Sequence, residues 1–354
     1  MMSWTPQVVL ANVTLSSAIE ACPVAFLPSD DARVESLNAA HSVHADFLSR
    51  FTDQFRQPVR PTVLVVESSA VEGYRRVEAM ASIRDLLSIC IVARARARHI
   101  QNKVSNHVFY SRSFDFYPWM VGQDHECLVA DTPAMTGFDV LSLFTGQTAA
   151  EVHLAKVSPD DLDRPLFDEL LKRWRHTYGG REASWDDTKL MRSLNMAFHA
   201  SQPPADQGAT VFDYGRILAL WVSALEILVH PGKGSRADKP KVLEHLKNVI
   251  WFAETCGKRA QETCHAIYRY RNDFLHGNPI DADAVPPVMS RDSLFGVAAP
   301  LYRMALASFL RLKCEEPLSL LDDPEKVGRQ MGASIDFRNY QRDFETAILQ
   351  CRAA

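Results

Sequence analysis

Hydrophobic residues in the C-terminal part of the chain recur every three to four positions, which is the period of an amphipathic α-helix. The segment Ser158-Pro159-Asp160-Asp161 has the capping residue and the acidic first turn that begin a helix. Beyond it, turn residues such as Gly179-Gly180 and Pro231-Gly232 separate the periodic segments. The pattern predicts seven helices, at 163–178, 185–200, 212–230, 239–255, 258–276, 294–313 and 335–351.

The first part of the chain mixes strand and helix patterns. Residues 63–66 form a Val-rich run after Pro61, and residues 108–117 alternate aromatic and polar side chains, so both segments are predicted to be strands. Residues 32–55 and 75–101 have the helical period. We therefore expect a mainly α chain, α+β overall, in which a mixed α/β module of residues 1–157 precedes an antiparallel helix bundle of residues 158–354.

Composition narrows the classes of function. The net charge of -4, from 39 Lys and Arg against 43 Asp and Glu, excludes a strongly basic nucleic-acid coat protein but allows a local basic patch. The seven cysteines include no Cys-x-x-Cys pair, which argues against a zinc site or a disulfide framework and fits the cytoplasm. The longest apolar stretch, residues 217–229, is too short to cross a bilayer, so no membrane association is expected.

The helix expected at 258–276 carries a charged residue on its hydrophobic face. Ile267, Tyr270, Arg271 and Phe274 follow the i, i+3, i+4, i+7 pattern of one helix face. A guanidinium group keeps its proton, so Arg271 needs hydrogen-bond acceptors there. Glu226, at the edge of the hydrophobic stripe of the helix at 212–230, is the carboxylate expected to accept from it.

His276 lies in the last turn of the same helix, which Gly277 is expected to end. An Arg followed by a His at this kind of spacing is common, because five such pairs occur in this chain, Arg269–His276 among them. The pair alone therefore identifies nothing. The specific features are Asn272 directly after Arg271, Gly277 directly after His276, and the upstream helix with its Trp-x-x-x-Leu-Glu sequence.

These features together resemble the HEPN superfamily, in particular its Apea-like branch. The matching residues are Trp221-Val222-Ser223-Ala224-Leu225-Glu226 and, further on, Tyr268-Arg269-Tyr270-Arg271-Asn272-Asp273-Phe274-Leu275-His276-Gly277. The family pattern is an Arg, a polar residue, a short spacer and a His, often followed by Gly. The resemblance covers roughly residues 160–315. It implies a HEPN-type bundle in which Glu226, Tyr268 and Gly277 support the motif.

The resemblance implies a metal-independent endoribonuclease that needs no cofactor. In that reading His276 moves the proton of the ribose 2′-hydroxyl or of the leaving oxygen, because imidazole titrates near neutral pH. Arg271 would stabilise charge on the reacting phosphate, and Asn272 would orient the phosphate or His276. RNA is then the expected partner. Since one chain supplies one motif, a homodimer is also implied.

Two alternatives remain open. The resemblance is equally compatible with a non-catalytic dimerisation or binding module, in which Arg271 and Glu226 form a structural pair and His276 caps a helix. By analogy with HEPN proteins, either function fits a stress or antiviral defence system. Separately, Arg94, Arg98 and Lys103 form a basic run that could contact RNA phosphates or could be a solvated helix face.

Overall fold

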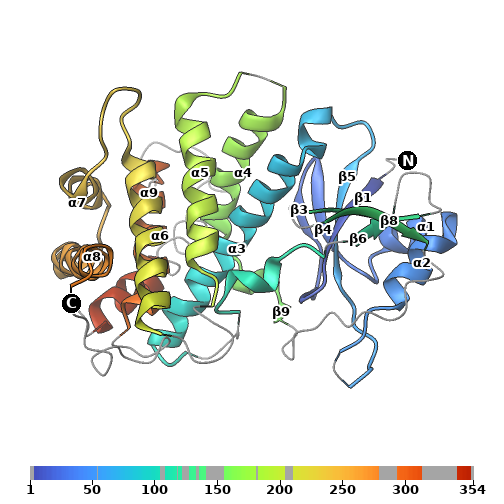
Figure 1. Cartoon of the computed structure of the whole chain (residues 1–354), viewed down its shortest axis with the longest axis horizontal. Coiled ribbons are helices and arrows are strands. Elements are labelled where there is room, and N and C mark those ends of the chain that lie inside the picture. Colours follow the sequence, from blue (N-terminus) through green and yellow to red (C-terminus); the bar gives the residue numbers. More distant parts are fainter. Residues whose placement is uncertain are drawn as a thin grey trace, which may run out of the picture. The chain divides into compact units, whose positions relative to one another are not determined.

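The structure is a computed structural model, and the chain forms two compact units, described here one at a time (Figure 1). The first unit comprises residues 1–80, 112–161 and 178–180, and the second comprises residues 81–111, 162–177 and 181–354. Residues described are 4–53, 55–103, 108–117, 119–121, 127–132, 135–140, 155–180, 182–203, 210–278, 293–312 and 341–351.

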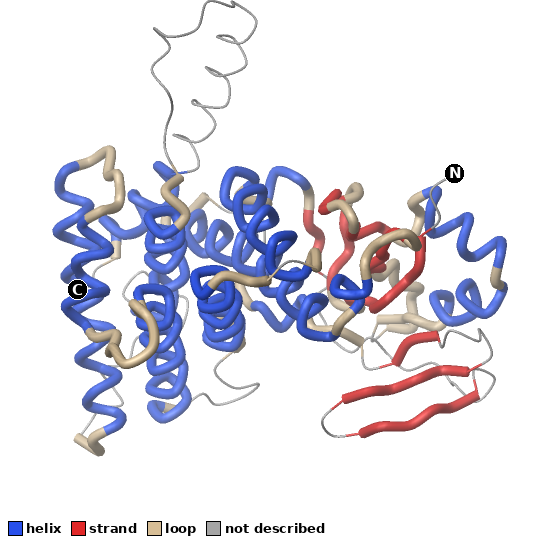
Figure 2. The backbone as a smooth tube through the Cα atoms, turned by 90° about the horizontal axis from the view of Figure 1, so that it is seen from above, coloured by secondary structure: helices blue, strands red, loops and turns tan. Residues whose placement is uncertain are grey.

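The described chain is mainly helical, as the sequence predicts, and every described strand belongs to the first unit (red in Figure 2). The units interleave along the sequence, because residues 81–111 pack with the later helices although they precede part of the sheet unit. The boundary that the sequence predicts between residues 157 and 158 concerns independently folding domains, and it stays a prediction. Among the described helices, none is both long and apolar enough to span a bilayer.

The first unit is built on a four-stranded antiparallel sheet with the order β1-β5-β4-β3. The predicted strand at residues 63–66 is confirmed as the core of β5, whose first five residues are buried. Its partners on both sides come from the first 28 residues, where the sequence analysis expected no strand. The strands of this sheet are β1 (Trp4–Leu10), β3 (Ile19–Ala21), β4 (Val24–Pro28) and β5 (Thr62–Glu67).

Two smaller sheets complete the strands of the first unit. One is antiparallel with the order β6-β7-β8, and the other is a parallel pair of β2 and β9 that joins residues far apart in the sequence. Their bounds are β2 (Val13–Leu15), β6 (Trp119–Val121), β7 (Cys127–Thr132), β8 (Met135–Val140) and β9 (Ala155–Val157).

The predicted strand at residues 108–117 is wrong. Residues Ser111–Phe114 form a turn of 3-10 helix, and the residues on either side of it are irregular. The buried positions are Val108, Ser111 and Phe114, which recur every third residue as in a 3-10 helix rather than every second residue as in a strand. The aromatic alternation in the sequence therefore did not correspond to alternating burial.

The long helix predicted at 32–55 is interrupted. It divides into α1 (Ala32–Ala40) and α2 (Ser42–Ser49), because His41 between them has an extended backbone with φ -139° and ψ 97°. The helix predicted at 75–101 is confirmed as α3 (Val77–Ile100). Most of α3 belongs to the second unit.

The second unit is a helical bundle whose elements follow the sequence prediction closely. The helix predicted at 239–255 ends early, because residues 248–253 form the connection to α8, which in turn starts before residue 258. The helices are α4 (Arg164–Tyr178), α5 (Trp185–Ala200), α6 (Val211–Val229), α7 (Lys239–Lys247), α8 (Glu254–Leu275), α9 (Leu294–Phe309) and a last helix at residues 341–350. The remainder of the helix predicted at 335–351 lies outside the described residues, except residue 351.

The core of the second unit lies around α9, whose residues 294–307 are all buried. The expected stripe of α6 is buried too, and its Trp221 contacts the ring of Tyr302 with 5.5 Å between ring centroids. Figure 1 shows α5 and α6 upright and α7 and α8 end-on, so the last two cross the bundle steeply. The predicted packing of α6 directly on α8 is confirmed. Whether the arrangement is specifically that of HEPN proteins stays a prediction.

Candidate functional site

The motif predicted from the sequence lies at the C-terminal end of α8. Gly277 adopts φ +67°, a left-handed conformation that favours glycine, directly after the capping residue His276. The N–H of Gly277 donates to the carbonyl of Phe274 at 3.3 Å, and that of Asn278 donates to the carbonyl of Asp273 at 2.9 Å. These two bonds form a Schellman motif, which ends the helix and fixes the backbone on which His276 sits.

The end of α8 presents its polar side chains to solvent. Asn272, His276 and Gly277 are exposed, whereas Arg271 is half-buried. The imidazole of His276 makes no hydrogen bond to any residue that the structure describes. Both of its ring nitrogens are therefore available to a ligand.

Arg271 does not pair with Glu226, contrary to the sequence prediction. Its Nη1 donates to Oδ1 of Asn272 at 3.0 Å, and its Nε is buried without a hydrogen-bond partner among the described residues. Glu226 instead accepts from the hydroxyl of Tyr268 at 3.0 Å. The packing of α8 on α6 therefore brings Tyr268, rather than Arg271, within hydrogen-bonding distance of Glu226.

Tyr268 and Arg271 both affect the pKa of Glu226. Burial raises its pKa, and the hydrogen bond from Tyr268 and the charge of Arg271 lower it by less than burial raises it. The same carboxylate and burial raise the pKa of the Tyr268 hydroxyl. Glu226 and Tyr268 thus form a partly buried link between α6 and α8.

Helix geometry separates Arg271 from His276. Arg271 and His276 are five residues apart, which places them about 140° apart around the helix axis. Asn272 and His276 are four residues apart and lie within about 40° of one another, on the same face. The structure therefore brings Asn272 and His276 together and directs Arg271 towards α6.

The basic run on α3 is largely engaged with the protein itself. Arg94 donates from Nη1 to the carbonyl of Leu162 at 3.0 Å, and Lys103 forms an ion pair with Asp343 at 3.1 Å. Arg94 and Arg98 are both half-buried. These bonds within the protein do not favour RNA binding by Arg94, Arg98 or Lys103, which stays a prediction.

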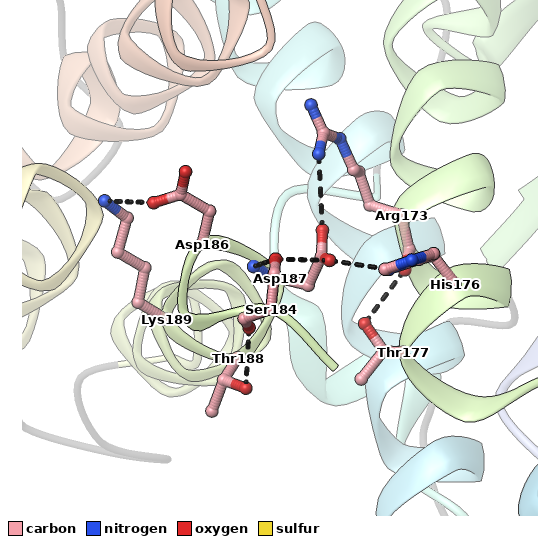
Figure 3. A network of polar contacts seen from close by, with 8 residues as sticks. All are labelled: Arg173, His176, Thr177, Ser184, Asp186, Asp187, Thr188 and Lys189. Atoms are coloured by element: carbon pink, nitrogen blue, oxygen red, sulfur yellow. Dashed lines mark hydrogen bonds and ion pairs between the residues drawn. The ribbon is translucent and has the colours of Figure 1, made fainter. Parts of the chain in front are cut away.

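Sequence reasoning missed a polar network between the end of α4 and the start of α5 (Figure 3). The buried carboxylate of Asp187 accepts from Ser184 Oγ at 2.6 Å, from His176 Nδ1 at 2.8 Å and from Arg173 Nη1 at 3.4 Å. Ser184 also caps α5 by accepting from the N–H of Asp187. The Ser-x-x-Asp spacing is a capping signal that could have been recognised, whereas the contribution of α4 could not.

Burial alone would raise the pKa of Asp187. The hydrogen bonds from Ser184 and His176 and the charge of Arg173 outweigh burial, so its pKa is lowered. The carboxylate occupies the bonding capacity of His176 Nδ1, and it lies between Ser184 and His176 rather than behind the histidine as in a nucleophilic triad. The network therefore joins two helices and does not activate Ser184.

In the described part of the chain, no three His, Cys, Asp or Glu side chains are grouped to hold a metal ion. No family model, no curated protein and no solved structure matches the chain.

Proposed function

We propose that the chain is a HEPN-type RNA-binding protein that cleaves RNA without a metal ion, with His276 as its proton-transfer group. The observation that carries the proposal is the exposed imidazole of His276 at the end of α8, which bonds to no described residue, with exposed Asn272 one helical turn before it. Imidazole can both accept and donate a proton near neutral pH, which is the chemistry that RNA cleavage requires.

The reaction is a transesterification within the RNA. His276 takes the proton of a ribose 2′-hydroxyl, and the 2′-oxygen forms a bond to the adjacent phosphorus as the bond from phosphorus to the 5′-oxygen breaks. The leaving 5′-oxygen takes up a proton from an imidazolium, either of His276 or of the same residue in a second copy. The products are a 2′,3′-cyclic phosphate and a 5′-hydroxyl. DNA is not cleaved because it has no 2′-hydroxyl.

The test is incubation of the full-length protein with labelled RNA in EDTA. Cleavage should persist in EDTA, should require a 2′-hydroxyl at the cut site, and should be lost in His276→Ala. The variant should remain folded, because His276 is exposed and its side chain bonds to no described residue. His199→Ala, which removes an exposed histidine of α5, controls for adventitious imidazole chemistry and should still cleave. Equal cleavage by wild type and His276→Ala would refute the proposal.

A second function, dimerisation, is favoured by exposed apolar side chains near the motif. Phe212 at the start of α6 is 71% exposed and Leu275 at the end of α8 is 50% exposed, and these helix ends meet where Phe274 contacts Gly215. Exposed apolar side chains that lie close together on a surface favour an interaction there. If the chain forms a homodimer there, Phe212→Asp with Leu275→Asp should yield a monomer by light scattering; an unchanged mass would exclude this surface.

A further inference from the structure

One face of α8 carries a row of polar side chains outside the Arg271 motif. His265, Arg269, Asn272 and His276 are all exposed, while the intervening residues 266–268 are buried. Their spacings of four, three and four residues stack the side chains along the helix within about 60° of arc. We call these four residues the α8 row.

The α8 row is chemically suited to an anionic chain. It presents two imidazoles, one guanidinium and one amide, and it contains no carboxylate. Arg269 makes no hydrogen bond or ion pair with any described residue, so all its donors are available. Burial and the charge of Lys239 lower the pKa of His265, which favours the neutral imidazole that can accept a hydrogen bond from a ribose hydroxyl.

Arg271 is placed differently from the row. It lies about 140° around the helix from His276, is half-buried, and bonds to Asn272. Arg269, by contrast, lies within about 20° of His276 on the helical wheel, two turns before it. The exposed guanidinium that shares a face with His276 is therefore that of Arg269.

We propose that the α8 row binds the sugar-phosphate backbone of single-stranded RNA, with Asn272 and His276 at the reacting phosphodiester and with Arg269 and His265 on the neighbouring nucleotide. His265 and His276 are eleven residues apart in the sequence, so the row extends over about 16 Å, which exceeds one phosphodiester. A single line of side chains along one helix matches a single backbone. This inference rests on the proposed function for its choice of RNA, and it assigns Arg271 to the packing of α8 rather than to the binding surface.

The experiment measures binding separately from cleavage. Fluorescence anisotropy of the full-length protein with a labelled 2′-O-methyl RNA oligonucleotide reports affinity, because this probe lacks the attacking hydroxyl. Arg269→Met should weaken binding about tenfold, since it removes charge-assisted hydrogen bonds to phosphate. It should also reduce the slope of log affinity against log salt by about one. The control Arg192→Met removes an exposed arginine of α5 that bonds to no described residue, and should leave both quantities unchanged.

The comparison that decides the inference is Arg269→Met against Arg271→Met. The loss of affinity should be larger for Arg269→Met, and melting curves of both variants will show whether a loss reflects unfolding. A larger loss for folded Arg271→Met, no loss for Arg269→Met, or no binding by the wild type would overturn the inference. Binding that depends on Arg269 with no cleavage of ordinary RNA would uphold it while refuting the proposed nuclease.

Discussion

The ring of Phe274 on α8 lies directly against Gly215 on α6, so closely that a Cβ at position 215 would lie 2.2 Å from the ring. Gly215 is buried within α6, where glycine would otherwise weaken the helix. Because glycine has no side chain, Gly215 leaves room for the ring of Phe274. The next residue along α8, Leu275, is already exposed.

Gly215→Ala should lower the free energy of unfolding by about 1–3 kcal/mol, because overpacking against Phe274 outweighs the better helix propensity of alanine. Urea denaturation followed by circular dichroism measures this change. In a Phe274→Ala background, Gly215→Ala should leave the free energy of unfolding unchanged or should raise it. If the cost at position 215 is the same in both backgrounds, the contact with Phe274 is not its cause.

Asp187→Asn should lower the free energy of unfolding by about 1–3 kcal/mol at pH 7, because the amide loses charge-assisted hydrogen bonds from Ser184, His176 and Arg173. Since the folded pKa of Asp187 is lowered, its contribution is present above the ordinary value of 3.8 and is lost as pH falls through the folded pKa. The difference between wild type and variant should therefore begin to shrink as pH falls below 3.8 and should be smallest below the folded pKa.

The neighbouring substitution Asp186→Asn is the control for the Asp187 network. Asp186 is 63% exposed and pairs with Lys189, so its removal should change the free energy of unfolding by less than about 1 kcal/mol. Equal losses for the two variants would mean that the buried network contributes no more than a surface ion pair.

Glu226→Gln should make the protein more stable relative to wild type as pH rises. The folded pKa of Glu226 is raised above 4.5. The contribution of its neutral carboxyl to the free energy of unfolding is therefore complete below pH 4.5 and is lost as pH rises through the folded pKa. Glutamine stays neutral and can still accept from Tyr268. Denaturation at pH 4.5 and pH 7 measures the difference; Glu244→Gln, at an exposed site, should show none.

Arg96→Lys should lower the free energy of unfolding by about 3 kcal/mol, because one ammonium group cannot replace a fork that bonds three carbonyls. The fully buried guanidinium donates to Phe109, Ser201 and Phe295 at 2.8–3.1 Å, joining three separate segments of the second unit. Thermal denaturation should compare Arg96→Lys with the control Arg98→Lys. Arg98 lies two residues later and is only half-buried, so a loss below about 1 kcal/mol is expected for its substitution. Similar losses at both positions would contradict this account.

The sequence by itself determined where most helices of the second unit lie. Local signals suffice for this, because the hydrophobic period of α6 and the turn residues around α5 act over a few residues. The α8 terminus was determined in the same way, since Gly277 supplies a left-handed residue wherever the helix packs. The end of α7 was predicted less well, because its hydrophobic pattern continues into the connection before α8.

Only the tertiary structure decided how distant segments pair and which face each polar residue occupies. β2 and β9 pair although Val13 and Ala155 are far apart in the chain, and strands so short carry little local signal. The partner of Glu226 was likewise open, because Tyr268 and Arg271 lie three residues apart on one helix and only packing selects between them. The spacing of Arg269, Asn272 and His276 places them on one face of α8, but only the packing of α8 on α6, with Phe274 against Gly215, decided that this face is exposed to solvent.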